Sequence, residues 1–195
     1  RAASRRRHRA GPGDDPPEAA IRPVTGMSVT PTGKSGATQR SAARLAAVQA
    51  LYQIELSGTP VTRVIDEFLQ TRLGSVAENE IHRDADRDLF SDVVQGFQGR
   101  QVEIDGLIGG CLDKDRTLAR LEAVQRALLR AGTYELLARP DVPARVVINE
   151  YVNVAHAFFA GAEPGFANGV LDQLARRLRP GEIDGAGSGR TRPAR

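Results

Sequence analysis

The fold of this chain is decided by residues 143–160, whose sequence is PARVVINEYVNVAHAFFA. Apolar side chains recur there at helical spacing and occupy nearly every side of the helix that they predict. A helix that is apolar nearly all round is typical of a protein interior, because each of its sides needs a packing partner. We therefore expect this helix at the centre of the molecule. Asn149 and Glu150 would then be at least partly buried, with hydrogen-bond partners on neighbouring helices or in the turn at 139–143.

The segments on either side repeat the helical period and predict further helices. None of them alternates between apolar and polar residues over the length of a strand. Prolines and glycines separate the segments at positions where helices begin or end. The predicted helices cover 37–57, 60–73, 84–112, 117–138, 143–160 and 164–179. This pattern predicts an all-α fold, a bundle of about seven helices.

Three glycines interrupt the longest of these segments, the helix predicted for 84–112. They are Gly96, Gly99 and Gly106. Glycine lowers the stability of a helix interior, so its repeated use here needs a reason. We expect a kink in this helix or a close contact with another helix.

The two ends of the chain differ in composition from the body. Residues 1–36 are rich in Pro and Gly with a net charge of +4, residues 181–195 are rich in Gly and Arg with +1, and residues 37–180 carry −2. Both ends bury too little apolar surface to offset the entropy lost on ordering, so we predict that they are disordered. Met27, the only methionine, predicts a start of translation there, which would leave 1–26 untranslated. Proteolytic processing or a cloning artefact would equally explain a sequence that does not begin with Met.

The composition argues against several classes of protein. No apolar run is long enough to span a membrane, and no secretory signal follows the basic N-terminal cluster. The single cysteine, Cys111, cannot form an internal disulfide, which indicates a cytoplasmic protein. The three histidines are not spaced as metal ligands, and no phosphate-binding loop is present. We therefore expect a binding protein without a metal, a cofactor or an enzymatic activity.

Two short stretches carry residues suited to binding a polar ligand. Arg40 and Arg44 lie four residues apart at the start of the first predicted helix, where a shared face and the unpaired N–H groups of the helix end favour phosphate. A solvated helix face is the alternative. In the last helix, Asn168-Gly169 interrupts the apolar pattern at a cost in helix stability. Either Gly169 packs closely against a neighbour, or Phe166 is exposed to stack an unpaired base beside Asn168.

Four segments together resemble the NusB family of transcription antitermination factors, in the order and spacing of that family. They are RLAAVQALYQ at 44–53, LLRAGTYEL at 128–136, VPARVVINEYVNVA at 142–155 and FANGVLD at 166–172. The resemblance covers about 38–180 and so makes 37–180 a NusB-like helical RNA-binding domain. It implies an all-α fold of two small helical subdomains, without a cofactor or catalysis.

The resemblance also implies a function and partners. Members of this family bind boxA, a single-stranded element of ribosomal RNA leader transcripts, and promote full transcription of ribosomal RNA operons. They do so with NusE, a small-subunit ribosomal protein, and with other Nus factors and RNA polymerase. Because the body carries few cations for phosphate, we expect RNA binding to depend on NusE.

Site residues follow from the same resemblance. The family contacts RNA through the arginine-rich start of its first helix and through the closing motif. In this chain these regions correspond to Arg40, Arg44 and Phe166, to which Asn168 and Lys34 add a base-reading amide and a further cation. The basic run found in several relatives is interrupted here by Ser41-Ala42.

The residues that face NusE are less clearly marked in the sequence. We expect the helix predicted at 117–138 to provide them, with Glu122 and Arg126 as exposed contacts. The oligomeric state is left open by the sequence, because relatives occur as monomers or dimers.

Two other interpretations of the chain remain open. Some ribosomal RNA cytosine-5 methyltransferases begin with a NusB-like domain and continue into a dinucleotide-fold catalytic domain, so the chain would be an N-terminal RNA-binding fragment of such an enzyme. A helical interaction module without a role in RNA binding is the third interpretation.

Overall fold

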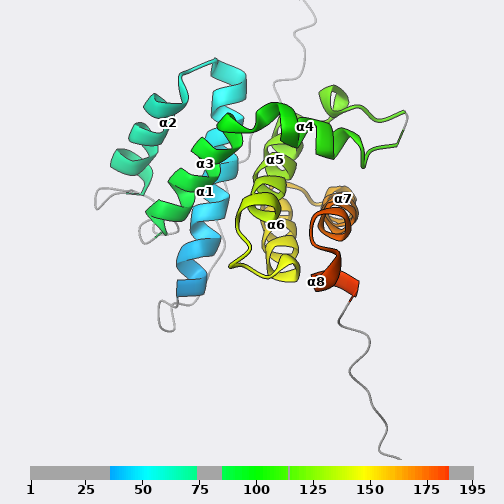
Figure 1. The fold of residues 1–195 in the computed structure, drawn as a ribbon. Helices are drawn as coiled ribbons and strands as arrows, with labels where there is room; N and C mark the ends of the chain where they lie inside the picture. Colours follow the sequence, from blue (N-terminus) through cyan, green and yellow to red (C-terminus); the bar gives the residue numbers. More distant parts are fainter. Residues whose placement is uncertain (1–35, 74–84, 114, 185–195) are drawn as a thin grey trace, which may run out of the picture. The chain divides into compact units, whose positions relative to one another are not determined.

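The computed structural model describes residues 36–73, 85–113 and 115–184. Within these residues every regular element is helical, which confirms the predicted all-α fold (Figure 1). A π-helical turn, Phe68–Arg72, continues α2, and a 3-10 turn, Leu118–Arg120, precedes α5. The α-helices are α1 (Gly36–Ser57), α2 (Val61–Glu67), α3 (Arg87–Gly99), α4 (Gln101–Gly109), α5 (Ala123–Ala138), α6 (Ala144–Phe158), α7 (Glu163–Leu178) and α8 (Pro180–Asp184).

The central helix of the bundle is α5 rather than α6. It packs against α1, α3, α4, α6 and α7, and its buried residues include the polar Thr133 and Glu135. In contrast, α6 is buried along one side only, and Val146 is 44% exposed on the other. Asn149 is exposed as well. The predictions of a central α6 and a buried Asn149 are therefore wrong, because apolar side chains also occur at protein surfaces.

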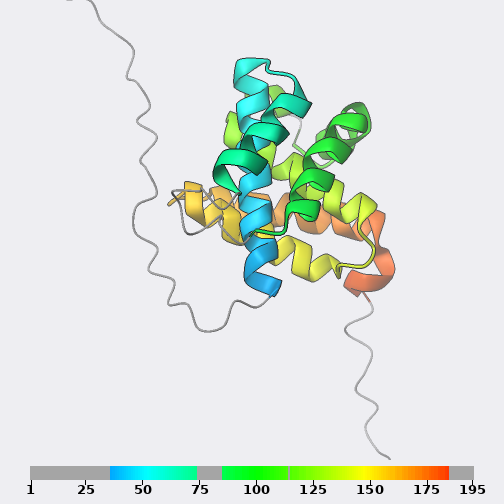
Figure 2. The same ribbon diagram turned by 90° about the vertical axis from the view of Figure 1, so that its left-hand side faces the viewer.

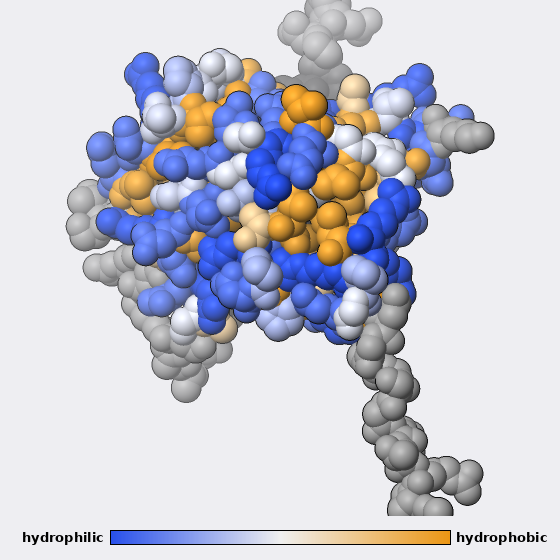
Figure 3. All heavy atoms as spheres, viewed as in Figure 1, coloured by the Kyte–Doolittle hydropathy of each residue, from blue (hydrophilic) through white to orange (hydrophobic). Residues whose placement is uncertain are grey.

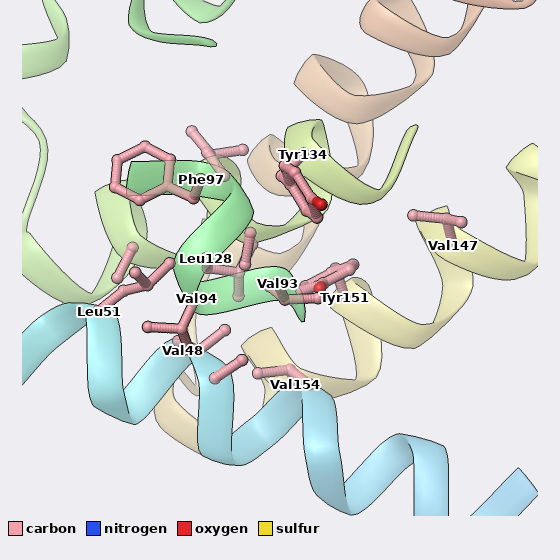
Figure 4. Packing of buried hydrophobic residues seen from close by; sticks show 14 of the residues in the cluster. Val48, Leu51, Val93, Val94, Phe97, Leu128, Tyr134, Val147, Tyr151 and Val154 are labelled. Carbon is pink, nitrogen blue, oxygen red and sulfur yellow. The ribbon is translucent and has the colours of Figure 1, made fainter. Parts of the chain in front are cut away.

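Apolar side chains of all the larger helices form one continuous core. In Figure 4, Val48 of α1, Val94 of α3 and Val154 of α6 point into the same interior. The helices form two groups, α1–α3 and α4–α8, which are joined because α5 packs against both α1 and α3. Within the second group α6 and α7 lie side by side, and α1 runs across α6 (Figure 2).

The helix predicted for 84–112 is broken into α3 and α4. The break lies at Arg100, whose backbone leaves helical geometry at φ −126° and ψ 19°. Gly96 provides a close contact with α5, because a Cβ atom at this position would overlap the ring of Tyr134. The expected kink and the expected close contact are both present.

The C-terminal segment 181–195, predicted to be disordered, begins with residues that are helical. Ile183 of α8 is buried, and its carbonyl oxygen accepts a hydrogen bond from Arg145 at 3.0 Å. Glu182 accepts a hydrogen bond from the backbone N–H of Ala144 at 2.7 Å. These contacts hold α8 against the start of α6. The remainder of this segment and residues 1–35 lie outside the described residues.

Candidate nucleic-acid interface

Arg44 lies in a buried ion-pair cluster that joins α1, α5 and α6. Its side chain is 3% exposed, and that of Glu135 is 0% exposed. The Arg44 Nε donates to Oε2 of Glu135 at 3.0 Å, and Nη1 donates to Oε2 of Glu150 at 3.0 Å. A carboxylate buried this deeply needs a cation beside it, which explains why the guanidinium turns inward. The prediction that Arg40 and Arg44 share an exposed face is therefore wrong.

Two hydroxyl groups complete this cluster. Ser41 donates to Oε2 of Glu150 at 2.5 Å, and Tyr151 donates to Oε2 of Glu135 at 3.1 Å. Burial and the Glu135 carboxylate raise the pKa of Tyr151, so its hydroxyl keeps the proton that it donates. Glu150 thus bonds two side chains of α1, and its predicted bonds to a neighbouring helix are confirmed. The partners lie on α1 rather than in the turn at 139–143.

Arg40 is exposed near the N-terminal end of α1, as predicted. Its Nε donates to the carbonyl oxygen of Gly36 at 3.3 Å, and no carboxylate of the described residues pairs with it. The guanidinium is therefore available to an anion next to the N-terminal end of a long helix. Lys34, the other cation predicted at this end, lies outside the described residues.

The closing motif forms the first turns of α7 and presents two exposed residues, Asn168 and Gly169. A Cβ atom at Gly169 would have no neighbour within 4 Å, so close packing does not explain this glycine. Phe166 is half-buried against the core, and the guanidinium carbon of Arg116 lies 5.0 Å from the centre of its ring. Residues two apart on a helix point to different sides, so Phe166 and Asn168 do not meet a single base together.

The two candidate regions lie on α1 and α7, whose main packing partners differ. α1 packs against α2, α3, α5 and α6, whereas α7 packs against α4, α5, α6 and α8. Arg116 lies on the connection between α4 and α5.

Of the two predicted partner contacts, only Glu122 is exposed, at the N-terminal end of α5. Arg126 is 17% exposed because its Nε donates to Oε1 of Glu55 at 2.8 Å. Its neighbour Arg130 pairs with Oε2 of Glu55 at 2.7 Å and with Oδ1 of Asp105 at 2.8 Å. These four charged side chains line a hollow of 410 Å³ and tie α1, α4 and α5 together. The prediction of an exposed Arg126 is wrong.

An apolar area of the surface is a better candidate for a protein contact. In Figure 3, hydrophobic side chains gather between α4 and α7 within a mostly hydrophilic surface. Val102 of α4 is 90% exposed. Exposed apolar surface of this kind is suited to a protein partner rather than to phosphate.

The described residues contain little that suggests catalysis. No group of three or more metal-ligating side chains is found among them, and none of their helices is long and apolar enough to cross a bilayer. Cys111 is half-buried, and burial raises the pKa of its thiol, which makes it a poor nucleophile at neutral pH.

Sequence reasoning missed two residues of this region. Glu135 continues the helical spacing of Leu128 and Ala131, both fully buried, and that spacing could have indicated its burial. Arg116 lies in a charged turn without periodicity, so no sequence signal links it to Phe166.

Comparisons with known proteins agree with this architecture. The model of the NusB family matches residues 41–176. A relative from Sphingopyxis alaskensis, named "Transcription antitermination protein NusB", is 52% identical over 143 residues, 73% of this chain and 96% of the relative. A relative of the same name from Nitrobacter winogradskyi is 53% identical over 147 residues, 75% of this chain and 91% of the relative. A solved structure of T. maritima NusB matches with a TM-score of 0.62 and 29% identity, over 75% of this chain and 96% of that one.

Proposed function

The chain belongs to the NusB family, and from this membership we propose that it is an antitermination factor that binds boxA-type single-stranded RNA together with NusE. It acts by binding, with other Nus factors and RNA polymerase, and not by catalysis. The relatives named as antitermination proteins are covered over 96% and 91% of their length. Their identities of 52% and 53% to this chain favour an antitermination factor over a ribosomal RNA methyltransferase.

The observation that carries the RNA proposal is the exposed Asn168-Gly169 pair on α7. Both residues lower the stability of a helix, and nothing packs against Gly169. An exposed amide beside a glycine gives the backbone of a single-stranded RNA room to approach closely, while the amide donates to and accepts from a base edge. Arg40 supplies a phosphate contact, which holds the RNA in position without reading its sequence.

The proposed dependence of RNA binding on NusE is supported by the number of arginines that are already paired within the fold. The arginines of the body whose guanidinium groups are taken up by carboxylates or by backbone carbonyls include Arg44, Arg126, Arg130, Arg139 and Arg179. Few cations are left for phosphate, and each phosphate contact contributes through counterion release. We propose that NusE adds basic surface and docks near Glu122 and the apolar area between α4 and α7.

A binding titration tests this function. The full chain is titrated with a fluorescent boxA-type RNA and with a scrambled RNA, each with and without NusE. NusE is expected to raise the affinity for boxA by about tenfold or more, on the order of 1.4 kcal/mol. Equal affinity with and without NusE would contradict the dependence on the partner, and equal affinity for the two RNAs would contradict boxA recognition.

Three variants locate the RNA contacts in the same titration. Asn168→Ala is expected to reduce the preference for boxA over scrambled RNA, because it removes a base-reading amide. Arg40→Ala is expected to weaken the binding of both RNAs to the same extent. It should also lower the slope of log affinity against log salt concentration (the salt slope) by about 0.7. Arg63→Ala is the matched control, since Arg63 of α2 is an exposed arginine without a carboxylate partner in the described residues. If Arg63→Ala lowers RNA affinity as much as Arg40→Ala does, the Arg40 effect reflects the change in net charge and not a local contact.

A further inference from the structure

We propose that Arg116 is a direct RNA contact and that Phe166 is a positioning residue that holds the Arg116 guanidinium in place. This inference rests on the proposed function, because it concerns a further contact to the same RNA. It replaces the expectation that the Phe166 ring itself stacks a base.

The geometry of the pair is that of a cation–π contact between two segments of the chain. The guanidinium carbon of Arg116 lies 5.0 Å from the centre of the Phe166 ring, within the range of about 6 Å in which such contacts are attractive. The backbone N–H of Arg116 donates to the carbonyl oxygen of Asp113 at 2.9 Å, which ties down the turn that carries it. The exposed side chain of Arg116 thus lies against α7 through its contact with the Phe166 ring.

The Phe166 ring itself is poorly placed to receive a base. It is half-buried and packs against the core, and the Arg116 guanidinium covers it from outside. A base that stacked on the ring would have to displace the guanidinium. A base that stacked on the guanidinium would leave the pair intact, because the outer side of a guanidinium plane also accepts bases.

Arg116 also differs in its partners from several other arginines of the chain. Arg126 and Arg130 pair with carboxylates, and Arg179 donates to backbone carbonyls. No carboxylate of the described residues pairs with Arg116, even though Asp113 and Asp115 lie in the same turn. Its N–H donors therefore remain available to a phosphate or a base edge, in addition to its planar face.

Arg116 extends the RNA path beyond the residues of the proposed function. Asn168 lies on a different side of α7 from Phe166, since residues two apart on a helix do not face each other. The Arg116 contact is therefore separate from the Asn168 contact, and variants at the two positions can be interpreted independently.

The experiment is a double-mutant cycle in the full chain. Affinity for a boxA-type RNA is measured at several salt concentrations for Arg116→Ala, Arg116→Lys, Phe166→Leu and the double variant Arg116→Ala/Phe166→Leu. Phe166→Leu keeps an apolar side chain against the core and removes the aromatic face. Arg63→Ala serves again as the control, and the melting temperature of each variant is recorded.

The proposal makes a distinct expectation for each variant. Arg116→Ala lowers RNA affinity by about tenfold or more, as expected if a base stacks on the guanidinium, and it lowers the salt slope by about 0.7. Arg116→Lys keeps the charge and the salt slope but loses affinity, because an ammonium group has no planar face. Phe166→Leu lowers RNA affinity in the parent chain. In the Arg116→Ala background it causes no further loss of affinity, as a positioning role requires.

Several outcomes would overturn the proposal. Parent-like RNA affinity of Arg116→Ala refutes the contact, and the proposed function still stands if Asn168→Ala or Arg40→Ala weakens RNA. A further loss from Phe166→Leu in the Arg116→Ala background means that the ring touches RNA directly. Weaker binding of NusE to Arg116→Ala in the absence of RNA assigns Arg116 to the protein partner instead of the RNA. A parent chain that does not distinguish boxA from scrambled RNA refutes the proposed function and this contact with it.

Discussion

Replacing Arg44 with alanine is expected to cost stability rather than an RNA contact. The substitution would leave Glu135 fully buried, with only the Tyr151 hydroxyl as a hydrogen-bond donor at 3.1 Å. Removing one partner of a buried ion pair costs about 3–5 kcal/mol, because the remaining charge has no compensation. The loss of the bond to Glu150 adds little, because that carboxylate is 22% exposed and reaches water.

The size of this effect makes it easy to measure. For a domain of this size, about 1 kcal/mol shifts the melting temperature by roughly 2–4 °C, so Arg44→Ala should lower it by about 6–20 °C. Thermal and urea unfolding, monitored by circular dichroism, give the melting temperature, the free energy of unfolding and the dependence of that free energy on urea concentration. RNA affinity is then measured at a temperature at which the variant is folded, where we expect it to equal that of the parent chain.

A second variant separates the ion pair from general damage to the core. Arg44→Met combined with Glu135→Gln removes both charges, so the double variant should recover part of the stability that Arg44→Met alone loses. Parent-like melting of Arg44→Ala together with lost RNA binding would refute the reasoning, since Arg44 would then act at the surface.

Further predictions concern neighbouring parts of the same core. Glu150→Ala should destabilise the protein by about 1–3 kcal/mol in urea unfolding, because it removes the acceptor of Arg44 Nη1 and one of the two acceptors of the Ser41 hydroxyl; wild-type melting would contradict this role. Gly96→Ala should lower the melting temperature, since its Cβ overlaps the Tyr134 ring, whereas Gly106→Ala, with nothing within 4 Å, should raise the stability by about 0.5–1 kcal/mol. Burial and the hydrogen bond to Asp92 raise the pKa of Tyr134 to about 12. The native state therefore keeps this proton while the unfolded chain loses it, and stability should fall from pH 10 towards 12, less steeply in Tyr134→Phe.

Much of the local structure follows from the spacing of apolar residues. The helical period and the prolines between segments predict α1, α6 and α7 to within about two residues of their observed ends, within the usual uncertainty of helix ends. The glycines of 84–112 predict the break and the close contact that the structure has at Arg100 and Gly96. These features depend on neighbours in the sequence, and so a pattern in the sequence can reveal them.

Which polar side chains lie inside could not be predicted in the same way. Arg44 and Arg126 were expected at the surface and are buried or nearly so, whereas Asn149 was expected inside and is exposed. The long apolar stem of arginine can be buried or exposed, so the burial of the side chain depends on whether the fold places a carboxylate beside its guanidinium group.

The sequence by itself therefore determined the helices of this chain, its all-α class and its resemblance to a family. Only the tertiary structure decided which arginines are available to RNA. The reason is that burying a charge is favourable only beside its partner, and Glu135 lies 91 residues from Arg44 in the chain. The same holds for Arg116, which meets Phe166 only because the connection between α4 and α5 folds over α7.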